Sequence, residues 1–307
     1  MRAVALAGRG PDDGGSGPRE GHVVLSVTEA GAGGRPLLAV HGFTGAKEDF
    51  GDHVGALAAE GWHVVAPDLR GHGASTHPPG SGAYHPDRLV ADLVDLLDAL
   101  GWPSAVVVGH SLGSALAQRL VLEHPARVAG LVLVAPFHGP LTTLDPGLVA
   151  LGEAVVRSGG LAALAQAMDA HRGADPAAVA ARARLEAAEP GYAERRHRQL
   201  VSCSADMWLA LAPRFCTWPD TLAAMAAVRV PTLVMVGSED EAMGPQARAL
   251  AEAVPGARLE VLEGAAHSPQ VEDAEGWRRR LVAYLRDAGL APGGPGGAGD
   301  RPGRGRR

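Results

Sequence analysis

The chain has 307 residues, of which 46% are hydrophobic, and its formal net charge is −6. A chain of this length and composition can bury a sizeable core without disulfide or metal cross-links. The negative charge disfavours nucleic acid as the main partner, because phosphate binding needs clustered positive charge. A small-molecule substrate is the expected partner, and the oligomeric state stays open.

Targeting signals are weak in this sequence. Residues 1–8 contain one arginine and an apolar run too short for a signal peptide. No run approaches the roughly 20 consecutive apolar residues that a membrane-spanning helix needs. The two cysteines, Cys203 and Cys216, lack the spacing of a zinc site or a disulfide framework, and both are expected to be reduced. We therefore expect a cytoplasmic protein with no membrane partner.

The two ends differ in composition from the middle. Residues 8–21 are rich in glycine, aspartate and proline, and residues 291–307 are almost entirely glycine, proline and arginine. Such segments bury too little apolar surface to offset the entropy lost on ordering. We expect residues 1–21 to form a flexible segment and residues 291–307 a disordered tail. The tail arginines could contact an acidic surface, although a solvated tail is the simpler interpretation.

Between the ends, short apolar runs alternate with longer amphipathic stretches, a pattern typical of strands joined by crossover helices. The expected strands are 36–41, 63–67, 105–109, 128–135, 231–237 and 258–262. The expected helices include 87–100, 112–123, 246–253 and 275–288. This predicts an α/β fold with a mostly parallel sheet flanked by helices, built from residues 22–137 and 227–290.

One segment interrupts this alternation. Residues 138–226 contain no strand-like run but several helical patches rich in alanine and arginine, including 176–188 and 192–202. Inserted between two strands, the segment cannot lie within the sheet, so we expect a helical lid over one edge.

Ser111 is the candidate nucleophile. It lies in Gly109-His110-Ser111-Leu112-Gly113, where an apolar strand is followed directly by a helix. A serine on so sharp a turn takes a strained backbone conformation and projects its hydroxyl from the sheet, while both glycines allow close approach of strand and helix. The helix N-terminus also favours a developing anion.

A serine hydroxyl needs a base to take its proton and a carboxylate to orient that base. Of 13 histidines, His267 is the candidate base, because it follows the last strand and can return over the Ser111 turn. Asp240 follows the preceding strand, at the same end of the sheet, and is the candidate acid. Its flanking residues Glu239 and Glu241 remain rivals, as does Asp145 after an earlier strand.

Two backbone N–H groups complete the expected site. The segment His41-Gly42-Phe43-Thr44-Gly45 follows an apolar run, and the N–H of Phe43 is expected to face an oxyanion beside that of Leu112. Backbone donors suit this role because they are fixed in place whatever the side chain.

These motifs together resemble the α/β-hydrolase superfamily over roughly residues 36–288. The shared motifs, in chain order, are His41 to Thr44, Asp68-Leu69-Arg70-Gly71-His72-Gly73-Ala74-Ser75, Gly109 to Gly113, and Gly237-Ser238-Glu239-Asp240 with His267. The resemblance implies a mostly parallel sheet, no metal ion, and the order serine, acid, histidine along the chain. It also implies that residues 68–75 are a structural loop. Ala266 before His267 is a minor departure from the family pattern.

The expected activity is serine hydrolase chemistry on an ester, lactone or thioester, with an acyl-enzyme at Ser111 and no cofactor. Members of this superfamily also cleave carbon–carbon bonds or use the triad in lyases, and some bind ligands with little turnover. Those that hydrolyse epoxides or remove halogens carry aspartate at the nucleophile position, which Ser111 disfavours. The lid offers apolar walls in Met207, Trp208, Phe215 and Trp218, and possible carboxylate partners in Arg157, Arg172, Arg195, Arg196 and Arg198. No substrate-binding residue can be chosen among them from the sequence.

Overall fold

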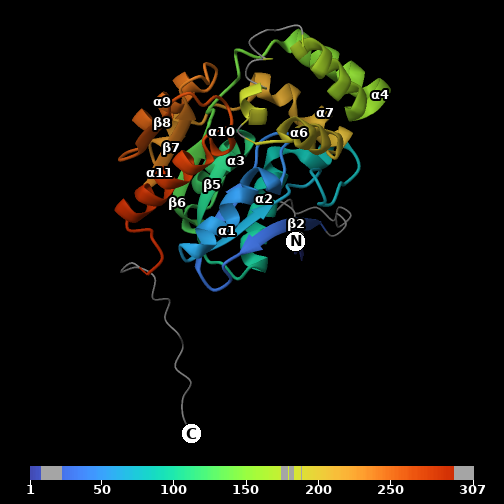
Figure 1. The fold of residues 1–307 in the computed structure, drawn as a ribbon. Helices are drawn as coiled ribbons and strands as arrows, with labels where there is room; N and C mark the ends of the chain where they lie inside the picture. The colour runs from blue at the N-terminus through green and yellow to red at the C-terminus, as the bar shows by residue number, and fades with distance from the viewer. Residues whose placement is uncertain (8–22, 174–178, 180–182, 188, 294–307) are drawn as a thin grey trace.

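The computed structural model describes residues 1–7, 23–173, 179, 183–187 and 189–293. Eight strands form one sheet in the order β1-β2-β4-β3-β5-β6-β7-β8 (Figure 1). They are β1 (Arg2–Ala5), β2 (Val24–Ala30), β3 (Arg35–Val40), β4 (Trp62–Pro67), β5 (Ala105–His110), β6 (Val128–Val134), β7 (Thr232–Gly237) and β8 (Arg258–Leu262). From β4 to β8 all neighbours are parallel, whereas β2 pairs antiparallel with both β1 and β4.

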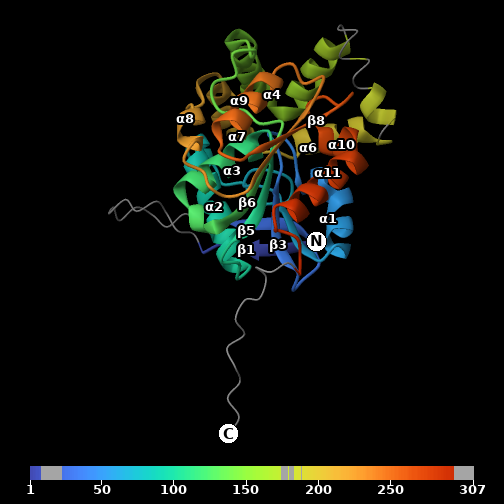
Figure 2. The same ribbon diagram turned by 90° about the vertical axis from the view of Figure 1, so that its left-hand side faces the viewer.

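Helices cover both faces of this sheet because both faces of its central strands are apolar. In β3, Leu37 and Ala39 join one buried cluster and Leu38 and Val40 join the other. The first cluster lies against α1 (Gly51–Ala59) and α11 (Ala274–Asp287), and the second against α2 (Pro86–Ala99), α3 (Leu112–Glu123) and α9 (Gly244–Ala253). Figure 2 shows α2 and α3 on one side of the central strands, with α1 and α11 on the other. The parallel α/β fold predicted from the sequence is confirmed.

A helical insertion separates β6 from β7. Its labelled elements are α4 (Pro146–Gly173), α6 (Tyr192–Val201), α7 (Ala205–Leu211), the 3-10 helix Pro213–Thr217 and α8 (Leu222–Met225). In Figures 1 and 2, α4, α6 and α7 lie beyond one end of the parallel strands. Helix α6 matches the predicted helix at 192–202, whereas most of the helix predicted at 176–188 falls outside the described residues. We refer to residues 138–226 as the lid.

Helix α4 is the one described helix long and apolar enough, by length and composition, to cross a membrane, over Pro146–His171. Gly160 inside it has non-helical dihedral angles (φ 70°, ψ −171°), so two helical segments meet there at a kink. Glu153 and Arg157 also interrupt its apolar sequence. A single helix of this kind is weak support for a membrane span, and the absence of a membrane partner stays a prediction.

The structure corrects the prediction at both ends of the chain. Residues 1–21 were expected to be flexible, but Arg2–Ala5 forms β1, whose Val4 is buried against the sheet. At the other end, Arg35 donates to the carbonyl of Ala291, so the tail predicted from residue 291 begins against the core. Residues 8–22 and 294–307 lie outside the described part of the chain.

Candidate active site

Ser111 occupies the turn between β5 and α3. Its backbone has φ 52° and ψ −115°, the positive φ expected of a serine on a strained strand-to-helix turn. The turn is held on both sides: the N–H of Ser111 donates to the carbonyl of Val134 at 2.9 Å, and its own carbonyl accepts the N–H of Ser114. The hydroxyl is thereby fixed at the carboxyl end of the parallel strands.

The two glycines flanking Ser111 are required by close backbone contacts. A Cβ atom on Gly109 would lie 2.3 Å from the carbonyl oxygen of Gly113, and one on Gly113 would lie 2.2 Å from that of Val40. Either contact is far below van der Waals separation, so a side chain at either position would push α3 away from the sheet.

The structure brings Ser111, His267 and Asp240 together. The Nε2 atom of His267 lies 3.1 Å from the Ser111 hydroxyl oxygen, and its Nδ1 atom lies 2.9 Å from Oδ2 of Asp240. The other carboxylate oxygen of Asp240 accepts the N–H of Met243 at 3.2 Å. Asp240 is buried, whereas the His267 side chain is 45% exposed. A neutral imidazole in this position can accept the serine proton while the carboxylate fixes its tautomer.

The rival acids lie elsewhere. Glu239 pairs with Arg184 of the lid, and Asp145 accepts the N–H of Gly147 at the start of α4. Glu241 is exposed. Among these carboxylates, Asp240 makes the hydrogen bond to His267.

The two backbone N–H groups expected to face an oxyanion belong to segments next to the serine, since a Cβ atom on Gly42 would lie 3.1 Å from Cβ of Ser111. Phe43 lies in the loop after β3, and the next residue, Thr44, has a positive φ of 56°. Leu112 is the first residue of α3. Neither the Phe43 nor the Leu112 N–H donates to a protein acceptor within the described residues, so both are available to an oxyanion.

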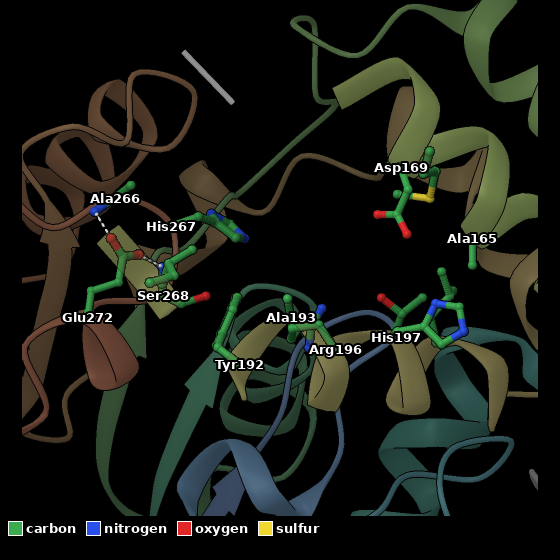
Figure 3. A pocket seen from close by; sticks show the side chains of 14 residues that line it. Ala165, Asp169, Tyr192, Ala193, Arg196, His197, Ala266, His267, Ser268 and Glu272 are labelled. Atoms are coloured by element: carbon green, nitrogen blue, oxygen red, sulfur yellow. Dashed lines mark hydrogen bonds between the residues drawn. The ribbon is translucent and has the colours of Figure 1, made fainter. Parts of the chain in front are cut away.

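A pocket of about 410 Å³ opens beside His267 (Figure 3). His267 and its neighbours form one wall and α6 another, with Ala165, Met168 and Asp169 of α4 opposite. Apolar atoms of Met168, Leu185 and Leu200 contribute to the lining, together with a few polar groups. This composition is typical of small-molecule sites.

The lid aromatics pack mainly against each other and the core. Phe215 lies edge-on to Phe43 with ring centroids 5.0 Å apart, and Phe215, Trp218 and Phe137 form a cluster. Met207 is completely buried. None of these side chains lines the pocket beside His267, so they support the lid rather than that cavity.

The lid arginines differ sharply in what they contact. Arg195 donates to both carboxylate oxygens of Glu189 and to Asp49, which ties α6 to the short helix Lys47–Phe50 that follows the loop after β3. Arg157 and Arg198 are exposed and pair with Glu153 and Glu194 one helical turn away, and the Arg172 side chain lies outside the described part. Arg196 alone of the described four lines the pocket.

Two residues near the triad were not anticipated from the sequence. His110 hydrogen-bonds the carbonyl of His267 through Nε2 at 2.8 Å, and Glu272 accepts the N–H groups of both Ala266 and Ser268 at 2.8 Å. Burial, with the nearby charge of His267, lowers the pKa of His110 to about 3. His110 is therefore neutral near pH 7 and donates through Nε2. The signal for His110 in the sequence was its place between Gly109 and Ser111. The signal for Glu272 was its position five residues after His267.

The described residues offer neither a cluster of metal ligands nor a reactive thiol. No group of three or more histidine, cysteine or acidic side chains there could hold a metal ion. Cys203 and Cys216 are unpaired, and burial raises the pKa of the Cys203 thiol to about 12. The expected absence of a metal ion and cofactor stays a prediction.

Comparison with known proteins places the chain in one family. Residues 35–274 match the family model described as alpha/beta hydrolase fold. The chain therefore belongs to the alpha/beta hydrolases. It is 31% identical over 264 residues to 2-hydroxymuconate semialdehyde hydrolase of Pseudomonas putida, covering 83% of this chain and 88% of that protein.

Other similarities are more local or concern the fold. Epoxide hydrolase A of Mycobacterium tuberculosis is 42% identical over 125 residues, which are 40% of this chain and 39% of that protein. The match thus spans about two-fifths of that relative. A thermophilic esterase from Thermogutta terrifontis, solved with malate bound, superposes with a TM-score of 0.77 at 24% identity, covering 94% of this chain and 99% of that one. At that identity the likeness shows the fold alone.

Proposed function

We propose that the protein hydrolyses a small-molecule ester, lactone or thioester through an acyl-enzyme at Ser111. The observation that carries this proposal is the chain of two hydrogen bonds from Ser111 through His267 to Asp240. In the first step His267 takes the serine proton, Oγ attacks the acyl carbon, and the N–H groups of Phe43 and Leu112 stabilise the oxyanion. His267 then protonates the leaving group, and water repeats the sequence to release the acid.

The local similarity to epoxide hydrolases does not extend to this chemistry. In the superfamily that these motifs resemble, the members that open epoxides use an aspartate carboxylate as the nucleophile. Here a serine occupies the nucleophile turn, with the strained backbone and histidine contact just described. The proposal therefore assigns acyl transfer rather than epoxide opening to this site.

A finer proposal is that the substrate bears a carboxylate. Arg196 lines the pocket beside His267, and its Nη1 donates to Gln199 at 2.8 Å. Nε and Nη2 make no hydrogen bond to a described residue, so they are available for a bidentate contact. Of the pocket carboxylates, Glu272 is occupied by backbone N–H groups and Asp169 has an interaction of its own. Asp49, 3.7 Å from Arg196, is already paired with Arg195.

The alternative activity is hydrolysis of a carbon–carbon bond with the same triad. It is favoured by the similarity to 2-hydroxymuconate semialdehyde hydrolase, which extends over most of both chains. That relative's named substrate is also a carboxylate, so both activities predict an acid beside Arg196.

The experiment is a screen of p-nitrophenyl esters of several chain lengths, with Ser111→Ala as the matched variant. Turnover of at least one ester by the wild type, lost in a correctly folded Ser111→Ala protein, supports the proposal. 2-Hydroxymuconate semialdehyde, the substrate named for the relative, assayed in parallel tests carbon–carbon hydrolysis. Equal ester turnover in both proteins would remove Ser111 from the mechanism, and binding without turnover of any substrate would indicate a ligand-binding protein.

A further inference from the structure

One carboxylate bridges the backbone on both sides of His267. Glu272 accepts the N–H of Ala266 through one oxygen and the N–H of Ser268 through the other, both at 2.8 Å. These two residues lie immediately before and after His267. One side chain therefore fixes the peptide groups on both sides of the candidate base.

Glu272 is itself connected to the core. It is the last residue of α10 (Pro269–Glu272), a short helix in which Pro269 and Gln270 are buried. The carbonyl of Gln270 hydrogen-bonds Nε2 of His53 on α1 at 2.7 Å. A continuous set of contacts thus runs from α1 through α10 and Glu272 to the backbone around His267.

The His267 side chain is only partly held by packing. It is 45% exposed and borders the pocket, its two ring nitrogens face Asp240 and Ser111, and its ring lies 5.2 Å from that of His110 between centroids. A shift of about 1 Å in such a group can reduce a rate by about 100-fold. The backbone bonds from Glu272, with that from His110 to the His267 carbonyl, are what set the position of the ring.

We propose that Glu272 is a positioning residue for the reaction: its carboxylate fixes His267 between Ser111 and Asp240. The inference rests on the proposed function, because it assumes that His267 is the base. Glu272 lines the same pocket as His267, and its negative charge favours a ring that becomes positive during acyl transfer, so it stabilises the imidazolium.

The charge of Glu272 acts among other titratable groups around His267. They are Asp240 from the loop after β7, His110 from β5, Arg196 and His197 from α6, and Asp169 from α4. Replacing Glu272 leaves all of these in place. Because the variant lacks one negative charge, its imidazolium is less stable and the rising limb of activity against pH moves to lower pH.

The test compares Glu272→Gln and Glu272→Ala with wild type and with Asp273→Asn. Glutamine retains one acceptor oxygen, whereas alanine retains none. Asp273 is a matched control, because its carboxylate also accepts a backbone N–H, that of Gly276, but does not contact the His267 loop. We expect kcat for a neutral ester to fall about 10-fold in Glu272→Gln and further in Glu272→Ala, with KM within about twofold. Asp273→Asn should change neither kcat nor the pH profile.

A second measurement needs no substrate: titration of the His267 imidazole by NMR, assigned by its absence in His267→Ala. The expected midpoint in Glu272→Gln is lower than in wild type. The proposal is supported if kcat falls more than about threefold and the midpoint of the imidazole titration is also lowered. A smaller fall in kcat, or a midpoint that is not lowered, overturns it. If no ester is hydrolysed at all, the proposed function fails, and the midpoint alone decides the role of Glu272.

Discussion

Ser111 has a positive φ that costs on the order of 1–3 kcal/mol in a non-glycine residue. The cost is offset by hydrogen bonds of its N–H to Val134 and of its carbonyl to Ser114, and by the close strand–helix contact that Gly109 and Gly113 permit. In this conformation the Ser111 hydroxyl lies 3.1 Å from Nε2 of His267.

The role of Asp240 can be tested against its rivals. We expect Asp240→Asn to lower kcat/KM about 1,000-fold or more, since an amide cannot fix the required imidazole tautomer. His267→Ala should be at least as damaging. The matched variants Asp145→Asn and Glu239→Gln should stay within about threefold of wild type, because neither residue contacts His267. Steady-state kinetics on one ester decides this: an active Asp240→Asn beside an inactive Asp145→Asn would reassign the acid.

Residue types at the nucleophile turn were predictable because local backbone geometry demands them. A strand that turns into a helix within five residues leaves room only for glycine at Gly109 and Gly113, on either side of Ser111. Glu272 was not predictable, because its value depends on where α10 places it relative to the His267 loop. Arg196 was one of five lid arginines named from the sequence as possible carboxylate partners, and only the packing of α6 distinguishes it from Arg195 or Arg198.

At the scale of elements, α6 links the lid to the loop beside the serine. Asp49, directly after that loop, is buried and accepts hydrogen bonds from Arg195 at 2.7 Å and Gln199 at 3.0 Å. Burial alone raises the pKa of Asp49, but the charges of Arg196 and Arg195 more than offset this and hold it below its usual value. The carboxylate is thus ionised, and opening the lid along α6 would separate a buried ion pair.

This position of α6 gives the carboxylate proposal a direct test. For a matched pair of esters, one neutral and one bearing a carboxylate, Arg196→Ala should lower kcat/KM for the anionic ester about 10-fold or more and change the neutral one little. Arg198→Ala is the control, because Arg198 lies outside the pocket and pairs with Glu194. An unchanged ratio of anionic to neutral ester in Arg196→Ala would reject the carboxylate site.

The central elements followed from local patterns, whereas the edge of the sheet did not. Strand β8 occupies the predicted residues 258–262 and α3 the predicted 112–123. Strands β1 and β2 were missed, although Leu25 and Val27 alternate with polar neighbours in β2. A four-residue strand such as β1 has no distinctive pattern of its own. Its partner lies more than twenty residues away, and only the pairing of Arg2 with Val27 and its neighbours defines it.

For the molecule as a whole, buried histidines make stability depend on pH. Burial lowers the pKa of His53, His72 and His110 from the usual 6.5. Below pH 6.5 the unfolded chain binds protons at these positions that the folded protein does not, so stability falls as pH falls. Each histidine lowers the free energy of unfolding by up to about 2 kcal/mol at pH 5.

We therefore expect a clearly lower Tm at pH 5 than at pH 7, measured by circular dichroism or calorimetry. Between pH 7 and pH 8 the three side chains are neutral in both states, and their contribution should not change. Equal Tm values at pH 5 and pH 7 would contradict the assigned burial of these rings.

That the protein works in the cytoplasm without a membrane partner remains a separate prediction.

The measurement that tests the central claim most directly is labelling with a fluorophosphonate, which reacts with a serine only when a neighbouring base activates it. We expect one adduct per chain, mapped by peptide mass spectrometry to Ser111, with labelling abolished in Ser111→Ala and strongly slowed in His267→Ala. An adduct on another residue, or labelling of Ser111 at the same rate without His267, would contradict it.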